Sequence, residues 1–113
     1  MHELSIALNI IEIVNETFAK TDAKKVNDIE LEIGKFSGVE LNALEFALET
    51  SMEQTHLKEA KVDIISVEGK GKCRNCSKLF LLRSLYDDCP GCGSSSVDLI
   101  SGRELKVKSI NVD

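Results

Sequence analysis

The chain of 113 residues has no tryptophan, one tyrosine and four phenylalanines. Proteins that bind single-stranded nucleic acid usually stack the bases on such rings, so their scarcity argues against this class. The chain also lacks an apolar run of about eighteen residues, which argues against a membrane-spanning helix. It has no charged segment followed by an apolar stretch and a small-residue cleavage site, so we expect a cytoplasmic protein.

The four cysteines form two pairs in the sequence, and two residues separate the cysteines of each pair. They are Cys73, Cys76, Cys89 and Cys92. Each Cys-x-x-Cys turn presents two thiolates to one ion, and two such turns complete the tetrahedron of a structural zinc site. Paired cysteines without a secretory signal favour metal ligation over disulfides. Four thiolates leave no open position for a substrate, so the pattern predicts a structural zinc ion and not a catalytic one.

The net charge of -5 is distributed unevenly along the chain. Residues 1–68 hold fourteen acidic residues against six lysines, whereas residues 69–113 hold eight lysines and arginines against five acids. The basic balance of the second part would suit nucleic acid, but a nucleic-acid-binding domain is usually clearly basic. Four thiolates around a divalent ion carry a net charge of -2. We therefore interpret the cations beside the first pair as offsetting that charge: Lys70, Lys72, Arg74 and Lys78.

Hydrophobic periodicity predicts two helices and a small sheet. Apolar residues recur at three- and four-residue steps over residues 4–18 and again over 40–52. Apolar and polar residues alternate over 26–33 and 60–68, which predicts two strands, and a further strand is expected near 105–112. The last strand has no local partner, so we expect it to join the first two. The predicted fold is α+β, with two helices packed on one face of a three-stranded sheet.

The helical patterns also predict which side chains face the core. They are Leu4, Ala7, Leu8, Ile11, Val14 and Phe18 in the first helix, and Leu41, Leu44, Phe46, Leu48 and Met52 in the second. Glycines and serines border the cysteine segment, which indicates a separate zinc-ribbon-like module inserted into the α+β domain. Within it, residues 79–82 are expected to form a short strand that covers the metal.

The chain begins Met1-His2-Glu3, directly before the first predicted helix. The Met1 amine, the His2 backbone nitrogen and the His2 imidazole can form two fused chelate rings around one ion. Nitrogen donors in a plane suit nickel(II) or copper(II). The first amides of a helix have no partner within it, so these backbone groups are spare. A histidine near an N-terminus is more often only solvated, and Glu3 also suits a first helical turn, where an acid favours the dipole.

Three segments together resemble one family. Met-His-Glu-Leu-Ser at the start, Ile-Gly-Lys-Phe-Ser-Gly-Val-Glu at 33–40 and the paired cysteines resemble the HypA/HybF hydrogenase maturation factors, which are nickel metallochaperones. The resemblance runs along essentially the whole chain. It implies a nickel-binding α+β domain of residues 1–68 and 97–113 that holds a zinc module of residues 69–96.

The resemblance also implies roles for particular residues and partners. His2 would be the essential nickel ligand, with Met1 and Glu3 beside it and Glu40 near the ion. The four cysteines would bind zinc. The implied partners are a nickel-handling GTPase and the precursor of the large subunit of a [NiFe] hydrogenase, with urease served in some organisms. A homodimer is compatible with the family, and neither nucleic acid nor membrane is expected as a partner.

The chain departs from some relatives at three places. Ser77 and Gly93 follow the cysteine pairs where some relatives have a histidine, so we expect coordination by thiolates alone. Thr17 stands roughly where some relatives have another histidine, so it cannot assist nickel. The only other histidine of this chain, His56, is expected to be a solvated surface residue.

Two other functional classes fit parts of the sequence. A zinc-ribbon module that binds nucleic acid or a transcription partner would use the basic balance after residue 68. An electron carrier would hold iron in the four-cysteine site. An enzyme has almost no support, because no nucleophile–base pair, phosphate loop or open metal site is evident.

Overall fold

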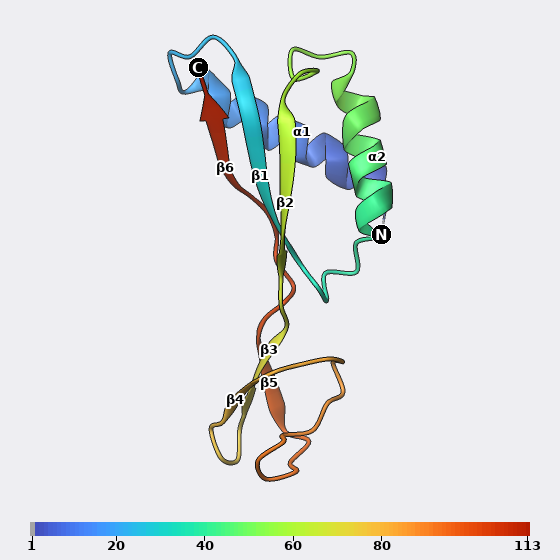
Figure 1. The fold of residues 1–113 in the computed structure, drawn as a ribbon, viewed down its shortest axis with the longest axis vertical. Helices are drawn as coiled ribbons and strands as arrows, with labels where there is room; N and C mark the ends of the chain where they lie inside the picture. The colour runs from blue at the N-terminus through green and yellow to red at the C-terminus, as the bar shows by residue number, and fades with distance from the viewer. Residues whose placement is uncertain (1) are drawn as a thin grey trace. The chain divides into compact units, whose positions relative to one another are not determined.

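The computed structural model describes residues 2–113, which form two helices and six strands (Figure 1). In chain order these are α1 (Glu3–Ala19), β1 (Val26–Gly34), α2 (Leu41–Met52), β2 (Lys61–Val67), β3 (Lys70–Cys73), β4 (Leu79–Leu81), β5 (Val97–Ser101) and β6 (Leu105–Val112). Neither helix of residues 2–113 is long and apolar enough to cross a membrane.

The first sheet has the strand order β2-β1-β6. β1 and β6 are antiparallel, since Lys25 and Asp113 exchange two backbone hydrogen bonds at one end of the pair. Ile29 and Leu31 of β1 are buried, whereas Glu30 and Glu32 point to the other face and pair with lysines of β6. The strand predicted from alternating apolar and polar residues is therefore confirmed, as is the expectation that the last strand joins this sheet.

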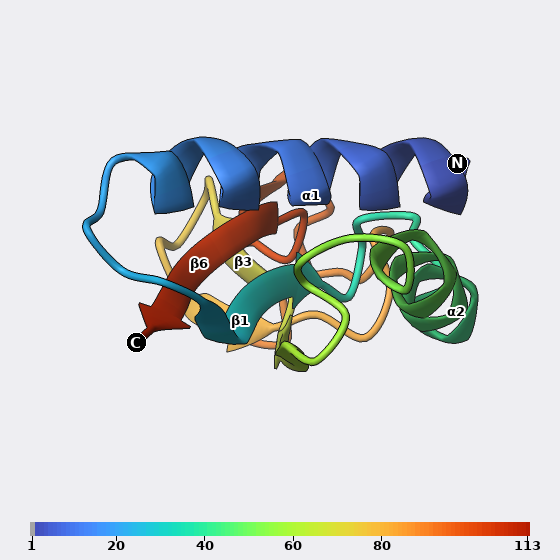
Figure 2. The ribbon, with the colours of Figure 1, turned by 90° about the horizontal axis from the view of Figure 1, so that it is seen from above.

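Helix α1 lies across the sheet (Figure 2) and buries a narrow stripe of Ala7, Ile10, Ile11 and Val14. Its N-terminal turns lie beside α2 in both views, and the two helices contact each other. The prediction that Leu4 and Leu8 face the core was wrong, because they are 57% and 53% exposed. Both side chains lie to one side of the buried stripe, so a pattern of apolar positions alone overestimated its width.

Helix α2 buries Leu44, Ala47, Leu48 and Met52. Phe46, predicted to face inward, is 70% exposed. It is two positions from both Leu44 and Leu48, and residues two apart on a helix do not share a face. The two leucines determine which face is buried, so Phe46 is turned outward.

The second sheet has the order β4-β3-β5, and both pairs are antiparallel. Sequence analysis predicted only β4 within the cysteine segment. β3 reads Lys-Gly-Lys-Cys, which has too few apolar residues to give an alternating signal, and β5 follows a run of serines. Gly71 of β3 is buried, and a Cβ at this position would lie 2.7 Å from Val97 Cγ1, so the close packing requires glycine here.

The chain forms two compact units. The first comprises Met1–Glu32, Val39–Ile65 and Lys106–Asp113, and the second comprises Ile33–Gly38 and Ser66–Leu105. The first unit contains both helices, and the second contains all of the β4-β3-β5 sheet and the four cysteines. The expected fold class, two helices with small sheets and a clustered four-cysteine site, is thus confirmed. The predicted bounds of the inserted module, residues 69–96, stay a prediction.

Glycine is required in the second unit where backbones approach closely. The Phe36 N–H donates to the Gly102 carbonyl at 2.7 Å. A Cβ on Gly102 would lie 2.9 Å from Gly69 Cα, and Gly102 has a φ of 121°. Backbone atoms cannot move aside as the end of a flexible side chain can, so any larger residue must shift a strand here.

We predict that Gly102→Ala destabilises the protein by about 2–4 kcal/mol, because it adds a steric overlap to an unfavourable φ. Gly38→Ala is the matched control, since Gly38 also has a positive φ, 80°, but an added Cβ meets nothing within 4 Å. The control should cost only about 1 kcal/mol. Urea unfolding of both zinc-loaded variants measures the difference, and equal losses would show that the close approach is unimportant.

Candidate metal centres

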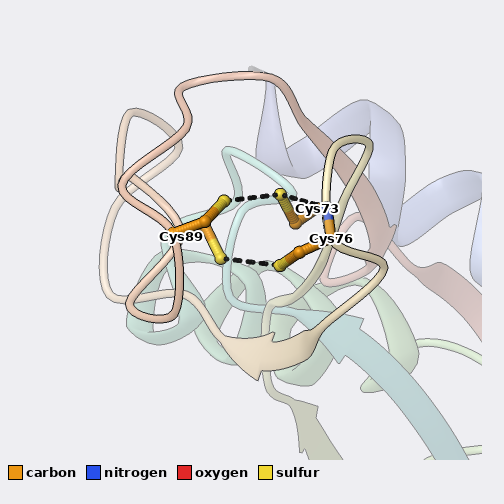
Figure 3. Close-up of side chains that lie close together, drawn as sticks. Cys73, Cys76 and Cys89 are labelled. Carbon is orange, nitrogen blue, oxygen red and sulfur yellow. Dashed lines mark hydrogen bonds between the residues drawn. The ribbon is translucent and has the colours of Figure 1, made fainter.

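The four cysteine thiols converge in the second unit. Their sulfurs all lie within 4.8 Å of one another, with 3.5 Å between Cys73 and Cys92 and 3.6 Å between Cys76 and Cys89. Sulfurs on a tetrahedron around zinc, with bonds of about 2.3 Å, would be about 3.8 Å apart. A disulfide requires about 2.05 Å, and all four cysteines are free. In Figure 3 Cys73 and Cys76 extend from one loop toward Cys89 on the opposite loop.

The two cysteine loops have the same backbone hydrogen bonds. In the first, Cys73 N–H donates to the Lys78 carbonyl at 3.0 Å, and its carbonyl accepts from Ser77 N–H at 2.9 Å. In the second, Cys89 N–H donates to the Ser94 carbonyl at 2.9 Å, and its carbonyl accepts from Gly93 N–H at 2.8 Å. The spacing of the cysteines predicted two turns, and in the structure both turns have the same pattern of backbone hydrogen bonds.

Both turns need a left-handed residue directly after their second cysteine. Ser77 has a φ of 63° and Gly93 a φ of 77°. Ser77 is the one non-glycine residue with positive φ among residues 2–113. The turn explains this strained conformation, because a positive φ at Ser77 reverses the chain and brings the Lys78 carbonyl to the Cys73 N–H.

Backbone N–H groups point at two of the sulfurs. Cys73 Sγ accepts from Cys76 N–H at 3.4 Å and from Asn75 N–H at 3.3 Å, and Cys89 Sγ accepts from Gly91 N–H at 3.3 Å. The Asn75 side-chain amide also donates to Cys92 Sγ at 3.7 Å. Donors of this kind favour the thiolate, so the loops are arranged for negatively charged sulfur.

The thiol pKa values follow these contacts. Backbone donation from Cys76, with that from Asn75, lowers the pKa of Cys73 to about 6. A backbone hydrogen bond from Lys78 lowers the pKa of Cys76, but hydrogen bonds shared with Cys89 and the other thiols, together with desolvation, raise it to about 11. A cation is needed to ionise all four sulfurs, and zinc supplies that charge at a site whose geometry suits it.

Arg74, which lies between the first two cysteines, connects that loop to β5. Its backbone N–H donates to the Ser96 carbonyl at 2.9 Å, and its guanidinium contacts Asp98 Oδ1 at 2.6 Å. The hydrogen bond and charge of Arg74 hold the pKa of Asp98 below its usual range. The charge of Arg74, which we expected to offset the thiolates, is thus paired with a carboxylate.

His2 occupies the N-cap position of α1 and is exposed. Its carbonyl accepts from Ile6 N–H at 3.2 Å, but its side chain makes no capping hydrogen bond. Glu3 is half-buried in the first turn. Met1, the other predicted nickel ligand, lies outside the described residues. The first amides of α1 therefore receive no cap from the His2 side chain.

Glu40 has a structural role that the sequence did not reveal. It is the N-cap of α2, and its carboxylate accepts from Asn42 N–H at 3.2 Å and from Ala43 N–H at 2.6 Å. A carboxylate has about four acceptor sites, so capping leaves room for a further ligand. The position of Glu40 directly before the apolar helical pattern is the sequence feature that could have predicted this capping role.

His56 lies on the surface of the first unit, as expected. Its Nε2 contacts Asn15 Oδ1 at 2.7 Å, and its ring stacks on Phe18 with centroids 5.5 Å apart. Within residues 2–113 the four cysteines are the only group of three or more histidine, cysteine and acidic side chains placed to hold one ion. His2, Glu3 and Glu40 are not gathered into such a group, so a site at His2 would depend on backbone nitrogens.

We predict that removing zinc, by chelation or by Cys73→Ser, unfolds the β4-β3-β5 sheet and leaves α1 and α2 helical. A segment this small cannot bury a core without its metal. Amide hydrogen exchange should show lost protection in β3, β4 and β5, while the far-ultraviolet helical signal persists. Loss of both signals in a single transition would contradict the division into two units.

The comparisons with known proteins cover the whole chain. The family model described as "Hydrogenase/urease nickel incorporation, metallochaperone, hypA" matches residues 1–112. The hydrogenase maturation factor HypA of Parabacteroides distasonis is 44% identical over 110 residues, which is 97% of this chain and 96% of that protein. The factor of the same name from Geotalea uraniireducens is 40% identical over 113 residues and the full length of both.

Solved structures agree with the sequence comparisons. The solution structure of the nickel metallochaperone HypA from Helicobacter pylori matches with a TM-score of 0.71 and 28% identity, over 99% of this chain and 97% of that one. A second HypA solution structure matches with a TM-score of 0.74 and 29% identity, over 99% and 96%. With two helices, small sheets, a four-cysteine cluster and matches along its full length, the chain belongs to the HypA family of nickel-incorporation metallochaperones.

Proposed function

We propose that this chain is a nickel metallochaperone that binds Ni(II) at its N-terminus and delivers it for maturation of a [NiFe] hydrogenase. One observation carries the proposal. In a chain that belongs to the HypA family, the only histidine near an exposed helix start is His2, and its imidazole is not used as a cap. The described N-terminal residues are therefore accessible to an incoming ion.

The chemistry of the donors supports nickel as cargo. The Met1 amine, the His2 backbone nitrogen and the His2 imidazole would bind Ni(II) in one plane, with the Glu3 backbone beside them. Glu40 could then add a carboxylate oxygen. A site built at a chain end keeps a position open for exchange with the receiving protein, which a four-thiolate site does not.

The zinc site would have a different task. Cys73, Cys76, Cys89 and Cys92 would hold Zn(II) in a closed tetrahedral shell that stabilises the second unit. Zinc supplies a charge that lets four thiolates remain together. We therefore propose a carrier and not an enzyme, which agrees with a family described as metallochaperones.

The family and its relatives indicate a place in the maturation pathway of a nickel enzyme. By the names of the relatives that enzyme is a hydrogenase, and the family description also includes urease. We propose as direct partners a nickel-handling GTPase and the precursor of the hydrogenase large subunit. Such an exchange would take place in the cytoplasm, before the enzyme is complete.

We predict that one equivalent of Ni(II) binds to untagged, zinc-loaded protein and that His2→Ala abolishes this binding. His56→Ala is the matched control, because His56 is engaged with Asn15 and Phe18 and should leave nickel affinity unchanged. Calorimetry with the visible nickel band measures both. Binding should weaken as pH falls from 7.5 to 6, since amine and imidazole must lose protons to coordinate. Equal binding in wild type and His2→Ala would rule out this site.

We predict that Glu40→Ser weakens nickel binding about fivefold, an effect of ~1 kcal/mol, while α2 keeps its stability. Serine is a preferred N-cap, so this change removes the carboxylate and retains a capping oxygen. Glu40→Ala removes both and should also cost about 1 kcal/mol of folding stability. If Glu40→Ser binds nickel as the wild type does, Glu40 acts only as a helix cap.

A further inference from the structure

We propose that the outer edge of β4, in the second unit, is a docking site for an extended acidic and apolar segment of a partner protein. β4 is an outer strand of the β4-β3-β5 sheet. An exposed strand edge can bind a peptide through main-chain hydrogen bonds, with neighbouring hollows giving specificity. This site goes beyond the proposed function, since it uses neither nickel nor any residue of the first unit.

Two backbone hydrogen bonds flank β4 and fix its pairing with β3. The Cys73 N–H donates to the Lys78 carbonyl at 3.0 Å, just before β4. The Leu82 N–H donates to the Gly69 carbonyl at 2.8 Å, just after it. In an antiparallel ladder, hydrogen-bonded pairs alternate with pairs that exchange no hydrogen bond.

The register then shows which backbone groups face outward. Gly71 is opposite Phe80, midway between the two flanking hydrogen bonds. This is therefore a hydrogen-bonded pair, and the backbone N–H and C=O groups of Phe80 point toward β3. Leu79 and Leu81 occupy the alternate positions. Their N–H and C=O groups therefore point away from β3, toward the open side of the sheet, where an added strand would bind them.

The side chains beside this edge are apolar and cationic. Leu79 and Leu81 are 64% and 62% exposed and lie on one face, because side chains two apart on a strand point the same way. Lys72 is opposite Leu79, and Lys70 is opposite Leu81. Within residues 2–113 neither lysine forms a salt bridge, but Lys72 is also opposite Asp98 of β5, and its charge helps to lower the pKa of that carboxyl. Lys70 is opposite Ser101 of β5 and has no acidic partner across the strand pair. The face thus presents two apolar side chains next to two positive charges without ion pairs.

Two hollows border β4. One of about 220 Å³ is lined by Lys70, Leu79, Phe80 and Leu81. The other, of about 200 Å³, is lined by Phe80, Leu81, Arg83, Asp87, Asp88 and Pro90. Successive side chains of an added strand point to opposite faces, so a strand at this edge could fill both.

An aromatic side chain stands just beyond the strand. Tyr86, the only tyrosine of the chain, is 92% exposed. It lies in a turn that is held by the Asp87 carboxylate, which accepts from Arg83 N–H at 2.7 Å and from Ser84 N–H at 3.2 Å. Tyrosine is enriched among the few residues that contribute most of the binding energy in protein interfaces. The proposed occupant would extend along β4 toward this ring.

Charge selects the occupant. Carboxylates on the face of the partner segment next to Leu79 and Leu81 would compensate the charges of Lys70 and Lys72. The alternate side chains point to the opposite face, where Asp87 and Asp88 line the second hollow, so apolar residues fit there better than acids. A second copy of this chain fits less well, because it would bring the same lysines to the edge. Short strands with lysine nearby are also a common protection against self-pairing.

The test uses two fluorescent seven-residue peptides in which valine alternates with glutamate or with lysine. Zinc-loaded protein is titrated at low salt and followed by fluorescence anisotropy. We expect the glutamate peptide to bind at least about tenfold more tightly than the lysine peptide. Lys70→Glu should weaken its binding about tenfold, whereas Lys61→Glu, an exposed lysine of β2, should have no effect.

A second pair of variants tests the backbone. Leu81→Pro removes an outward N–H that forms no bond to β3, and Leu81→Ala removes the same side chain but keeps the N–H. With one zinc retained in each, the proline variant should lose peptide binding and the alanine variant should keep most of it. Equal affinity for both peptides, or no binding at about 1 mM, would overturn the proposal. So would a dimer of the free protein that Leu81→Pro dissociates, since the edge would then serve a second copy.

Discussion

The convergence of four sulfurs within 4.8 Å is the constraint on which the second unit depends. Thiolates that lie 3.5 and 3.6 Å apart repel one another, so they can all be ionised only around a cation. Equivalent backbone hydrogen bonds hold each loop in the shape that this requires. The positive φ of Ser77 and the side chain of Arg74 are explained by the same requirement, since one closes a loop and the other joins it to β5.

The two helices of the first unit differ in how their N-termini are capped. At α2 the Glu40 carboxylate satisfies two of the free amides, which stabilises the helix and occupies its N-terminus. At α1 the corresponding side chain is an imidazole that forms no cap and is exposed. An imidazole is a poor helix cap and a good metal ligand. His2 therefore stabilises α1 less than a capping residue would, but its imidazole nitrogens stay available for a metal ion. This contrast supports a carrier that holds one metal permanently and another transiently.

Most of the fold could be predicted from the sequence, because hydrophobic periodicity and cysteine spacing are local signals. The strict alternation around Leu31 located β1, and the two Cys-x-x-Cys pairs located the zinc site. Phe46, Leu4 and Leu8 were misplaced because the depth of burial depends on which elements pack together, and periodicity does not give this. The strands β3 and β5 were not predicted, because β3 consists mostly of lysine and glycine and a run of serines directly precedes β5. The capping role of Glu40 was not predicted, because it requires the exact first residue of α2, and helix ends are the least certain feature of a sequence pattern.

In the function proposed above, one chain holds two metals with two different donor sets. X-ray absorption at the zinc and nickel edges of one sample, loaded with one equivalent of each metal, tests it most directly. We expect zinc to be surrounded by sulfur alone at about 2.3 Å, and nickel to be surrounded by nitrogen and oxygen with no sulfur neighbour. Sulfur in the nickel shell would mean that nickel enters the cysteine site, and the assignment of separate structural and transferable metals would be wrong.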